Sequence, residues 1–255
     1  MSDAPHSTLS TMEQAGYLSG EAAVLGQHVR QQYGTLLRDC AMASRTAMAI
    51  LCAGVSGPES MNAALAAWLR SISACQAGVL LAERGMVSEA SAILRTGFEH
   101  LFYAMALLKD PTVLDRMRDQ DLYERQHTVR RALADADVGT VISAEQREAL
   151  QAVLQRPGGN LRISAFQAAE IAGLAAIFQT TYRQLSLVGT HANYTSVGVS
   201  FGASLGELQF VQPMDELPLV LGHIQGCLQL GSGAFLAVQT PNAPGSAAEA
   251  PPPAR

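Results

Sequence analysis

Apolar side chains recur at steps of three and four residues along most of this chain, the spacing of one face of an α-helix. Glycine and proline interrupt the pattern, and Gly85 has the place of a left-handed cap at a helix end. Ser143 and Gln146 have the spacing of a capping box. The pattern predicts an all-α fold, a multi-helix bundle of about six to seven helices. They cover residues 19–53, 59–84, 89–109, 111–134, 143–155 and 164–188, and a stretch after residue 214.

The pattern changes before the last of these helices. Val197, Val199 and Phe201 alternate with small residues, and a glycine-containing turn separates them from Leu208 and Phe210. Alternation of β-branched and aromatic residues about such a turn is typical of two paired strands. We therefore expect a small β-hairpin before the last helix.

The two ends of the chain are rich in Pro, Ala and Ser and have no apolar pattern to bury. They predict a disordered N-terminus at 1–15, a single helical domain at 16–240 and a disordered Pro/Ala-rich tail at 241–255. A chain of 255 residues, 48% of them hydrophobic, is long enough for one sizeable core. The helix at 111–134 carries charges of both signs at high density, which indicates a solvated outer face.

Composition excludes several classes of function. A net charge of −5 disfavours a nucleic-acid partner. The four cysteines are widely spaced, without the close pairs of a thiolate zinc site or a redox motif, so we expect reduced thiols, a cytoplasmic location, no metal and no cofactor. Residues 217–240 are uncharged and long enough to cross a bilayer. Because His223 and three glutamines recur through them, we expect a buried helix and no membrane partner.

Two sets of polar residues are candidates for a functional site. Arg95 and Glu99 are four residues apart on an otherwise apolar helix, so they share one face. They form either an intrahelical salt bridge at the surface or a buried polar group that reaches another helix. The second set is Tyr182, Arg183, Ser186 and, just past the helix end, His191. His191 can titrate near neutral pH or simply cap the helix.

The same residues carry a resemblance to a family. Leu94, Arg95 and Glu99 form a Leu-Arg-x3-Glu motif after Gly85, and residues 182–191 form Tyr-Arg-x2-Ser-x4-His. With this order and separation, residues 60–240 resemble a widespread bacterial family of all-helical proteins of unknown function. The resemblance implies that Arg95, Glu99, Ser186 and His191 converge in one polar cluster between helices. Some members are distantly similar to HEPN helical bundles, which include RNA-cleaving proteins with an Arg-x4-6-His motif; Arg183 and His191 depart from that spacing.

Three functions are compatible with these observations. The first is a binding or interaction module whose binding residues are Arg95, Glu99, Tyr182, Ser186 and His191, with an unknown small ligand or protein partner. The second is a metal-independent HEPN-like RNase or defence-type protein in which His191 is the general acid or base and Arg183 or Arg95 stabilises phosphate charge. In the third the cluster is purely structural and function depends on an outer face or on homo-oligomerisation. Whether the cluster lines a cavity separates the first from the third.

Overall fold

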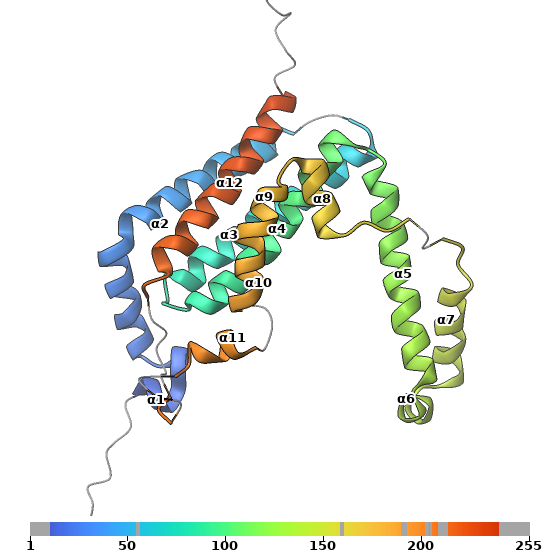
Figure 1. Cartoon of the computed structure of the whole chain (residues 1–255), viewed down its shortest axis with the longest axis horizontal. Coiled ribbons are helices and arrows are strands. Elements are labelled where there is room, and N and C mark those ends of the chain that lie inside the picture. The colour runs from blue at the N-terminus through green and yellow to red at the C-terminus, as the bar shows by residue number, and fades with distance from the viewer. Residues whose placement is uncertain are drawn as a thin grey trace, which may run out of the picture.

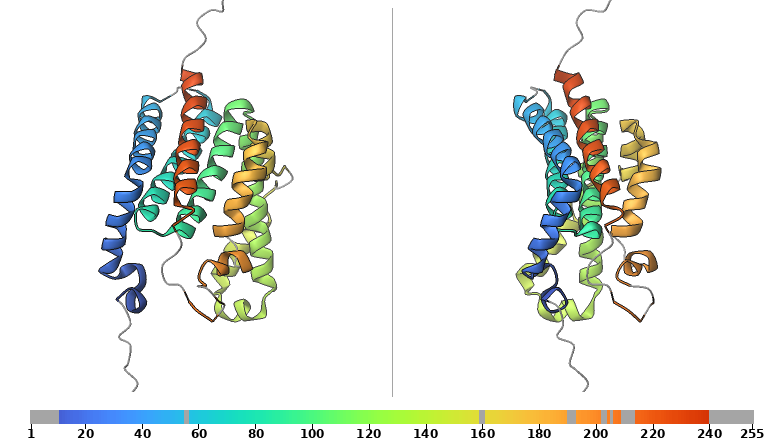
Figure 2. Two further views of the ribbon diagram at one scale, coloured as in Figure 1. Left: turned by 60° about the vertical axis from the view of Figure 1, so that its left-hand side comes forward. Right: turned by 90° about the vertical axis from the view of Figure 1, so that its left-hand side faces the viewer.

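The structure, a computed structural model, describes residues 11–54, 57–158, 161–189, 193–201, 204, 206–208 and 214–239. Four long helices form its body: α2 (Glu21–Ala53), α3 (Glu59–Ala82), α4 (Val87–Lys109) and α12 (Leu217–Gln239). They lie side by side with their long axes roughly aligned (Figure 2). The all-α prediction is confirmed, and Gly85 has the expected positive φ of 75°.

The centre of the body is built from aromatic and aliphatic side chains of these helices. Trp68 of α3 stacks on Phe235 of α12 with ring centroids 4.3 Å apart, and neither ring is exposed to solvent. A second aromatic group joins α4 to residues 178–182, where Phe102 contacts both Phe178 and Tyr182. Burial of these apolar faces is the main favourable term in holding the helices together.

Residues 164–188 do not form the single long helix that the sequence predicts. They divide into α8 (Ala165–Ala172), α9 (Ala175–Ile177), the π-helical turn η2 (Phe178–Tyr182) and α10 (Arg183–Gly189). The first break is at Gly173, whose left-handed conformation with φ of 76° caps α8. The expected count of six to seven helices is therefore wrong, mainly because this segment is broken and several short helices were not anticipated.

The predicted β-hairpin is also corrected. Residues Tyr194–Gly198 form a short helix, α11, because the side chain of Asn193 accepts a hydrogen bond from the Ser196 N–H and so caps it. Within the described part of this region, the only β-type pairing is an isolated antiparallel bridge between Phe201 and Leu208. Residues 202–203, 205 and 209–213 of the expected hairpin lie outside the described residues.

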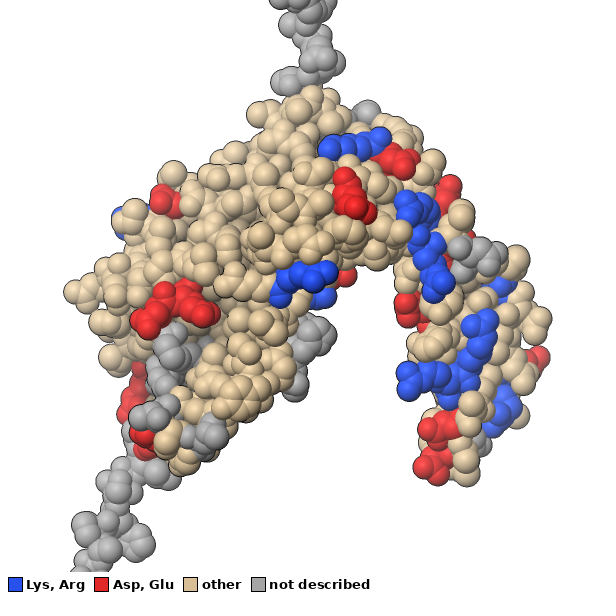
Figure 3. Space-filling model, viewed as in Figure 1, with Lys and Arg blue, Asp and Glu red and all other residues tan. Residues whose placement is uncertain are grey.

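A helical arm projects from the body. It consists of α5 (Val113–Ala134), α6 (Ala136–Val141) and α7 (Ala144–Leu154). Figure 1 shows that these helices extend away from the body and are separated from it along most of their length. α7 begins with the predicted capping box of Ser143 and Gln146. Only Val113, Gln126 and Val129 of α5 are buried, which confirms the solvated character of this helix. In the view of Figure 3 the arm shows more basic than acidic side chains.

The N-terminal part of the described chain is folded against the body. Residues Thr11–Ala15 form α1, within the segment expected to be disordered, and a 3-10 turn, η1 (Gly16–Leu18), follows. Met12 is buried and its N–H donates to Glu21, which explains why this part is ordered. Residues 1–10 and the predicted tail at 241–255 lie outside the described residues.

Two helices of the body, α3 and α12, are long and apolar enough to cross a membrane. Buried core helices of soluble proteins meet the same criterion, and one face of each packs within the body here. α12, which the sequence predicts as a buried helix, buries one face against α2, α3 and α4.

Candidate functional site

Arg95 and Glu99 lie on the side of α4 that faces α10. Their side chains form an ion pair, with Arg95 Nη1 2.9 Å from Glu99 Oε2. Because each follows a core residue, Leu94 or Phe98, both side chains are at the edge of the buried face, 21% and 34% exposed. The pair is therefore neither a fully solvated surface bridge nor a fully buried one.

The second half of the cluster comes from η2 and α10. The Tyr182 hydroxyl donates to Glu99 Oε2 at 2.9 Å, and Arg95 Nε donates to the Ser186 hydroxyl at 2.9 Å. The Arg95 guanidinium also lies 4.5 Å from the centre of the Tyr182 ring, a cation–π contact. Ser186 in turn donates to the Tyr182 carbonyl oxygen. Four of the predicted site residues thus meet at the junction of α4 with η2 and α10. Arg95 and Glu99 reach another helix, as one of the two interpretations expects, although the pair is only partly buried.

Close backbone packing fixes α10 against α4 near this cluster. A Cβ atom on Gly189, the last residue of α10, would lie 2.9 Å from the Ala92 Cα atom. Any larger residue at 189 would push the two backbones apart. Glycine at this position therefore allows Arg95 and Ser186 to approach within hydrogen-bonding distance.

Two other predicted site residues are not part of this cluster. Arg183 precedes Ser186 on α10, but its side chain is exposed and has no hydrogen bond or ion pair within the described part of the chain. His191 lies outside the described residues, so its expected convergence with Arg95, Glu99 and Ser186 stays a prediction, and so does its role in the RNase hypothesis.

Comparison with known families bears directly on these residues. Residues 61–207 match a family of unknown function, DUF5677. The chain belongs to the DUF5677 family. All four residues of the cluster lie within the matched region, whereas α2 and α12 lie outside it. No curated protein and no solved structure matches the chain, and its similarity to HEPN bundles stays a prediction.

In this DUF5677 chain the charge of the Glu99 carboxylate helps to raise the pKa values of two neighbouring tyrosines. Burial, followed by the charge of Glu99, raises the pKa of Tyr182 well above its usual range, so its hydroxyl remains a donor at physiological pH. The same two causes raise the pKa of Tyr103 to about 12, and its hydroxyl donates to the Ile163 carbonyl oxygen. Tyr103 was missed in the sequence, although it follows Glu99 by four residues and so shares its helix face.

His100 is a second residue that the sequence analysis did not single out. Burial, followed by the nearby positive charge of Arg70, lowers the pKa of its imidazole and favours the neutral form.

No residue of the cluster lines the main cavities in the described part of the chain. The nearest is a small cleft between α4, α10 and α12 that contains Ser91, Leu185 and His223. Among the described residues, no group of three His, Cys, Asp or Glu side chains is placed to hold a metal ion. What the cluster offers chemically is a carboxylate, a guanidinium and two hydroxyls at a partly open helix junction.

Proposed function

We propose that this chain is a binding module whose recognition surface includes the exposed side of the Arg95, Glu99, Tyr182 and Ser186 cluster. The observation that carries the proposal is the π-helical turn η2, which ends at Tyr182. Single π-helical turns are unfavourable interruptions of α-helices and occur frequently at functional sites. Here the interruption directly precedes α10 and includes the residue whose hydroxyl reaches Glu99.

The unused atoms of the cluster suggest the chemistry of the ligand. Glu99 Oε2 accepts from both Arg95 and Tyr182, while Glu99 Oε1 and Arg95 Nη2 have no hydrogen bond within the described residues. A hydrogen-bond acceptor and a donor thus lie side by side at a partly exposed position. Peptide groups present the complementary donor and acceptor. We therefore favour a segment of a protein partner as the ligand.

The energetics of the ion pair support a functional role. Removing two charges from water costs several kcal/mol, about the amount that a good ion pair returns, so partly buried pairs contribute little net stability. A purely structural junction would be served equally well by apolar side chains of similar volume. The charged residues are thus better explained by what they bind than by what they stabilise.

The second candidate is the purely structural cluster with function through oligomerisation. It is favoured by one observation: in the described part of the chain, the main cavities contain no residue of the cluster. The two candidates differ in the expected stability of a charge-free junction. A binding cluster predicts that Arg95→Met with Glu99→Leu leaves the melting temperature unchanged or raises it, whereas a structural cluster predicts a fall of several degrees.

A displayed random-peptide library, selected on the purified protein, tests the proposal directly. We expect enriched peptides whose binding weakens about tenfold or more with Glu99→Gln or Tyr182→Phe, because a charged hydrogen bond is lost or its acceptor is repositioned. The matched control is Arg125→Gln, which breaks an exposed pair of the same helical spacing with Asp121 on the arm. Equal binding by Glu99→Gln and wild type, or no enrichment at all, would refute the proposal.

We propose a cytoplasmic location as well. Among the described residues the four cysteines are unpaired, and Cys40, Cys75 and Cys227 are buried. Burial raises the pKa of Cys40 to about 11, which keeps it as an unreactive thiol. Free buried thiols are typical of proteins in a reducing compartment.

A further inference from the structure

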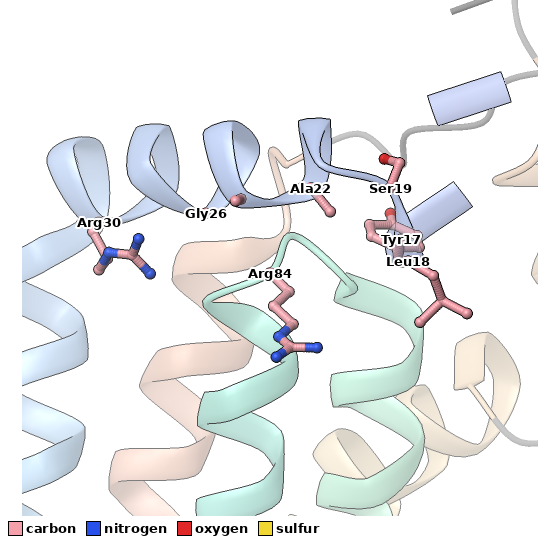
Figure 4. A pocket seen from close by; sticks show the side chains of 8 residues that line it. Tyr17, Leu18, Ser19, Ala22, Gly26, Arg30 and Arg84 are labelled. Atoms are coloured by element: carbon pink, nitrogen blue, oxygen red, sulfur yellow. The ribbon is translucent and has the colours of Figure 1, made fainter. Parts of the chain in front are cut away.

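A cavity of about 410 Å³ lies between the start of α2 and the end of α3, on the N-terminal side of the molecule and away from the polar cluster. Arg30 of α2 and Arg84, just after α3, both line this cavity, and Figure 4 shows the Arg84 side chain extending along the end of α3. Tyr17 and Leu18 of η1 form a further wall, with Ala22 and Gly26 along α2. Two arginines from distant parts of the sequence therefore share one cavity.

The turn that carries Arg84 is fixed from two sides. The Tyr17 hydroxyl donates to the Gly85 carbonyl oxygen at 3.2 Å. Gly26 allows α2 to approach this turn, because a Cβ atom there would lie 3.0 Å from the Glu83 carbonyl oxygen and 3.5 Å from Arg30 Nη1. The hydrogen bond of Tyr17 and the close approach at Gly26 thus hold the backbone next to both arginines in place.

The charged side chains that line this cavity are both positive. No carboxylate is among its lining residues, and neither Arg30 nor Arg84 has a hydrogen bond or ion pair in the part of the chain that the structure describes. Two positive charges that line one cavity give it a positive potential, which favours an anionic ligand over a neutral one. This arrangement occurs in a chain with a net charge of −5, in which carboxylates outnumber basic residues.

We propose that this cavity binds a small phosphate monoester. A guanidinium offers parallel N–H donors that match the geometry of phosphate oxygens, and two of them balance the charge of a phosphate dianion. The organic part of the ester is accommodated by Leu18, a large apolar side chain that is 92% exposed and lines the cavity. A cavity of this size is at the lower end of the range for small-molecule sites.

The site is independent of the peptide surface proposed above. Arg30, Tyr17 and Leu18 lie outside the region that matches the DUF5677 family, whereas the polar cluster lies inside it. Failure of one proposal therefore leaves the other unaffected.

Isothermal titration calorimetry with phenyl phosphate tests the proposal, with phenyl sulfate as a ligand of the same shape and one charge fewer. We expect phenyl phosphate to bind the full chain at millimolar or lower concentration and more tightly than phenyl sulfate or inorganic phosphate. Because the second ionisation of a phosphate ester has a pKa of about 6, binding should weaken as the pH falls from 7.5 to 5.

Variants then locate the site. Arg30→Gln and Arg84→Gln should each weaken phenyl phosphate binding about tenfold or more, since each removes a charged hydrogen-bond donor. Leu18→Ser should weaken phenyl phosphate but not inorganic phosphate. The matched control is Arg38→Gln, an exposed arginine two turns further along α2 whose described contact is with Thr35. All four positions are exposed or line the cavity, and equal melting temperatures would establish that the variants fold.

Three results would overturn the proposal. The first is that folded wild-type protein does not bind phenyl phosphate at pH 7.5. The second is an equal effect of Arg38→Gln and the two cavity arginines. The third is tighter binding of a dicarboxylate such as phthalate, which would show that the arginines select a carboxylate ligand instead.

Discussion

A glycine in the middle of α12 provides the sharpest test of the packing described here. Gly231 is buried directly against the indole ring of Trp68. A Cβ atom at this position would overlap Trp68 Nε1 and lie 2.9 Å from Cδ1 and 3.1 Å from Cε2. The ring cannot move aside easily, because it is fully buried and stacked on Phe235 at 4.3 Å. The substitution Gly231→Ala therefore forces a displacement within the buried core of the body.

The size of the effect follows from two opposing terms. Overpacking a core costs about 1–3 kcal/mol, whereas replacing glycine by alanine within a helix contributes about 1 kcal/mol of stability. Gly233 provides the control, because it is on the same helix and a Cβ atom there meets nothing within 4 Å. Both variants gain the helical term, so the difference in their stabilities isolates the steric cost.

Thermal unfolding followed by circular dichroism measures this difference. For a chain of this size, 1 kcal/mol shifts Tm by about 2–4 °C. We expect Gly233→Ala to melt at or above the wild-type temperature, and Gly231→Ala to melt about 2–12 °C below Gly233→Ala. The steric cost should shrink in a Trp68→Phe background, which removes Nε1. Equal melting temperatures for the two alanine variants would refute the packing of α12 on α3.

Three further predictions concern titratable groups and a helix end. Of the four thiols, only exposed Cys52 should react with a thiol reagent before unfolding, and Cys52→Ser should leave no fast-reacting thiol. Burial lowers the pKa of His100 and His223, so below about pH 6.5 the unfolded chain binds more protons than the folded one. Stability should therefore be full above that pH and decline below it. When Tm is measured from pH 7.5 to 5, the decline of Tm should be smaller in His223→Gln than in wild type. Ser143→Ala removes the cap of α7 and should cost about 1 kcal/mol, seen as lower helicity of the arm, whereas Ser143→Asp should retain it.

Local signals in the sequence were sufficient for much of the fold. The left-handed Gly85 and the capping box at Ser143 depend only on residues a few positions apart, and both are present as predicted. The hairpin failed for a local reason too, because the alternation of Val197 and Val199 was given more weight than the capping side chain of Asn193. The helix end at Gly173 was also not predicted, because the apolar pattern continues on both sides of this glycine.

Contacts between helices could be predicted only in part from the sequence. The four-residue spacing placed Arg95 and Glu99 on one face, but which residues would face them depends on how α10 docks, including the close approach of Gly189 to Ala92. The cavity of Arg30 and Arg84 had no sequence signal, because the two arginines are far apart in the chain and neither is in a motif. Likewise, Gly231 and Gly233 are indistinguishable in sequence, and only the position of Trp68 separates them.

The small amount of buried surface in the arm affects how this molecule unfolds. Its long helix buries three side chains and the described α7 buries none, so little apolar surface holds these helices to each other or to the body. Regions of this kind unfold locally at a lower free energy than the core to which they are attached. Backbone amides of α5 and α7 should accordingly exchange with deuterium long before those of α3 and α4, in one separate cooperative step. The chain would then consist of two foldons, a stable body and an arm that samples unfolded conformations while the body remains native.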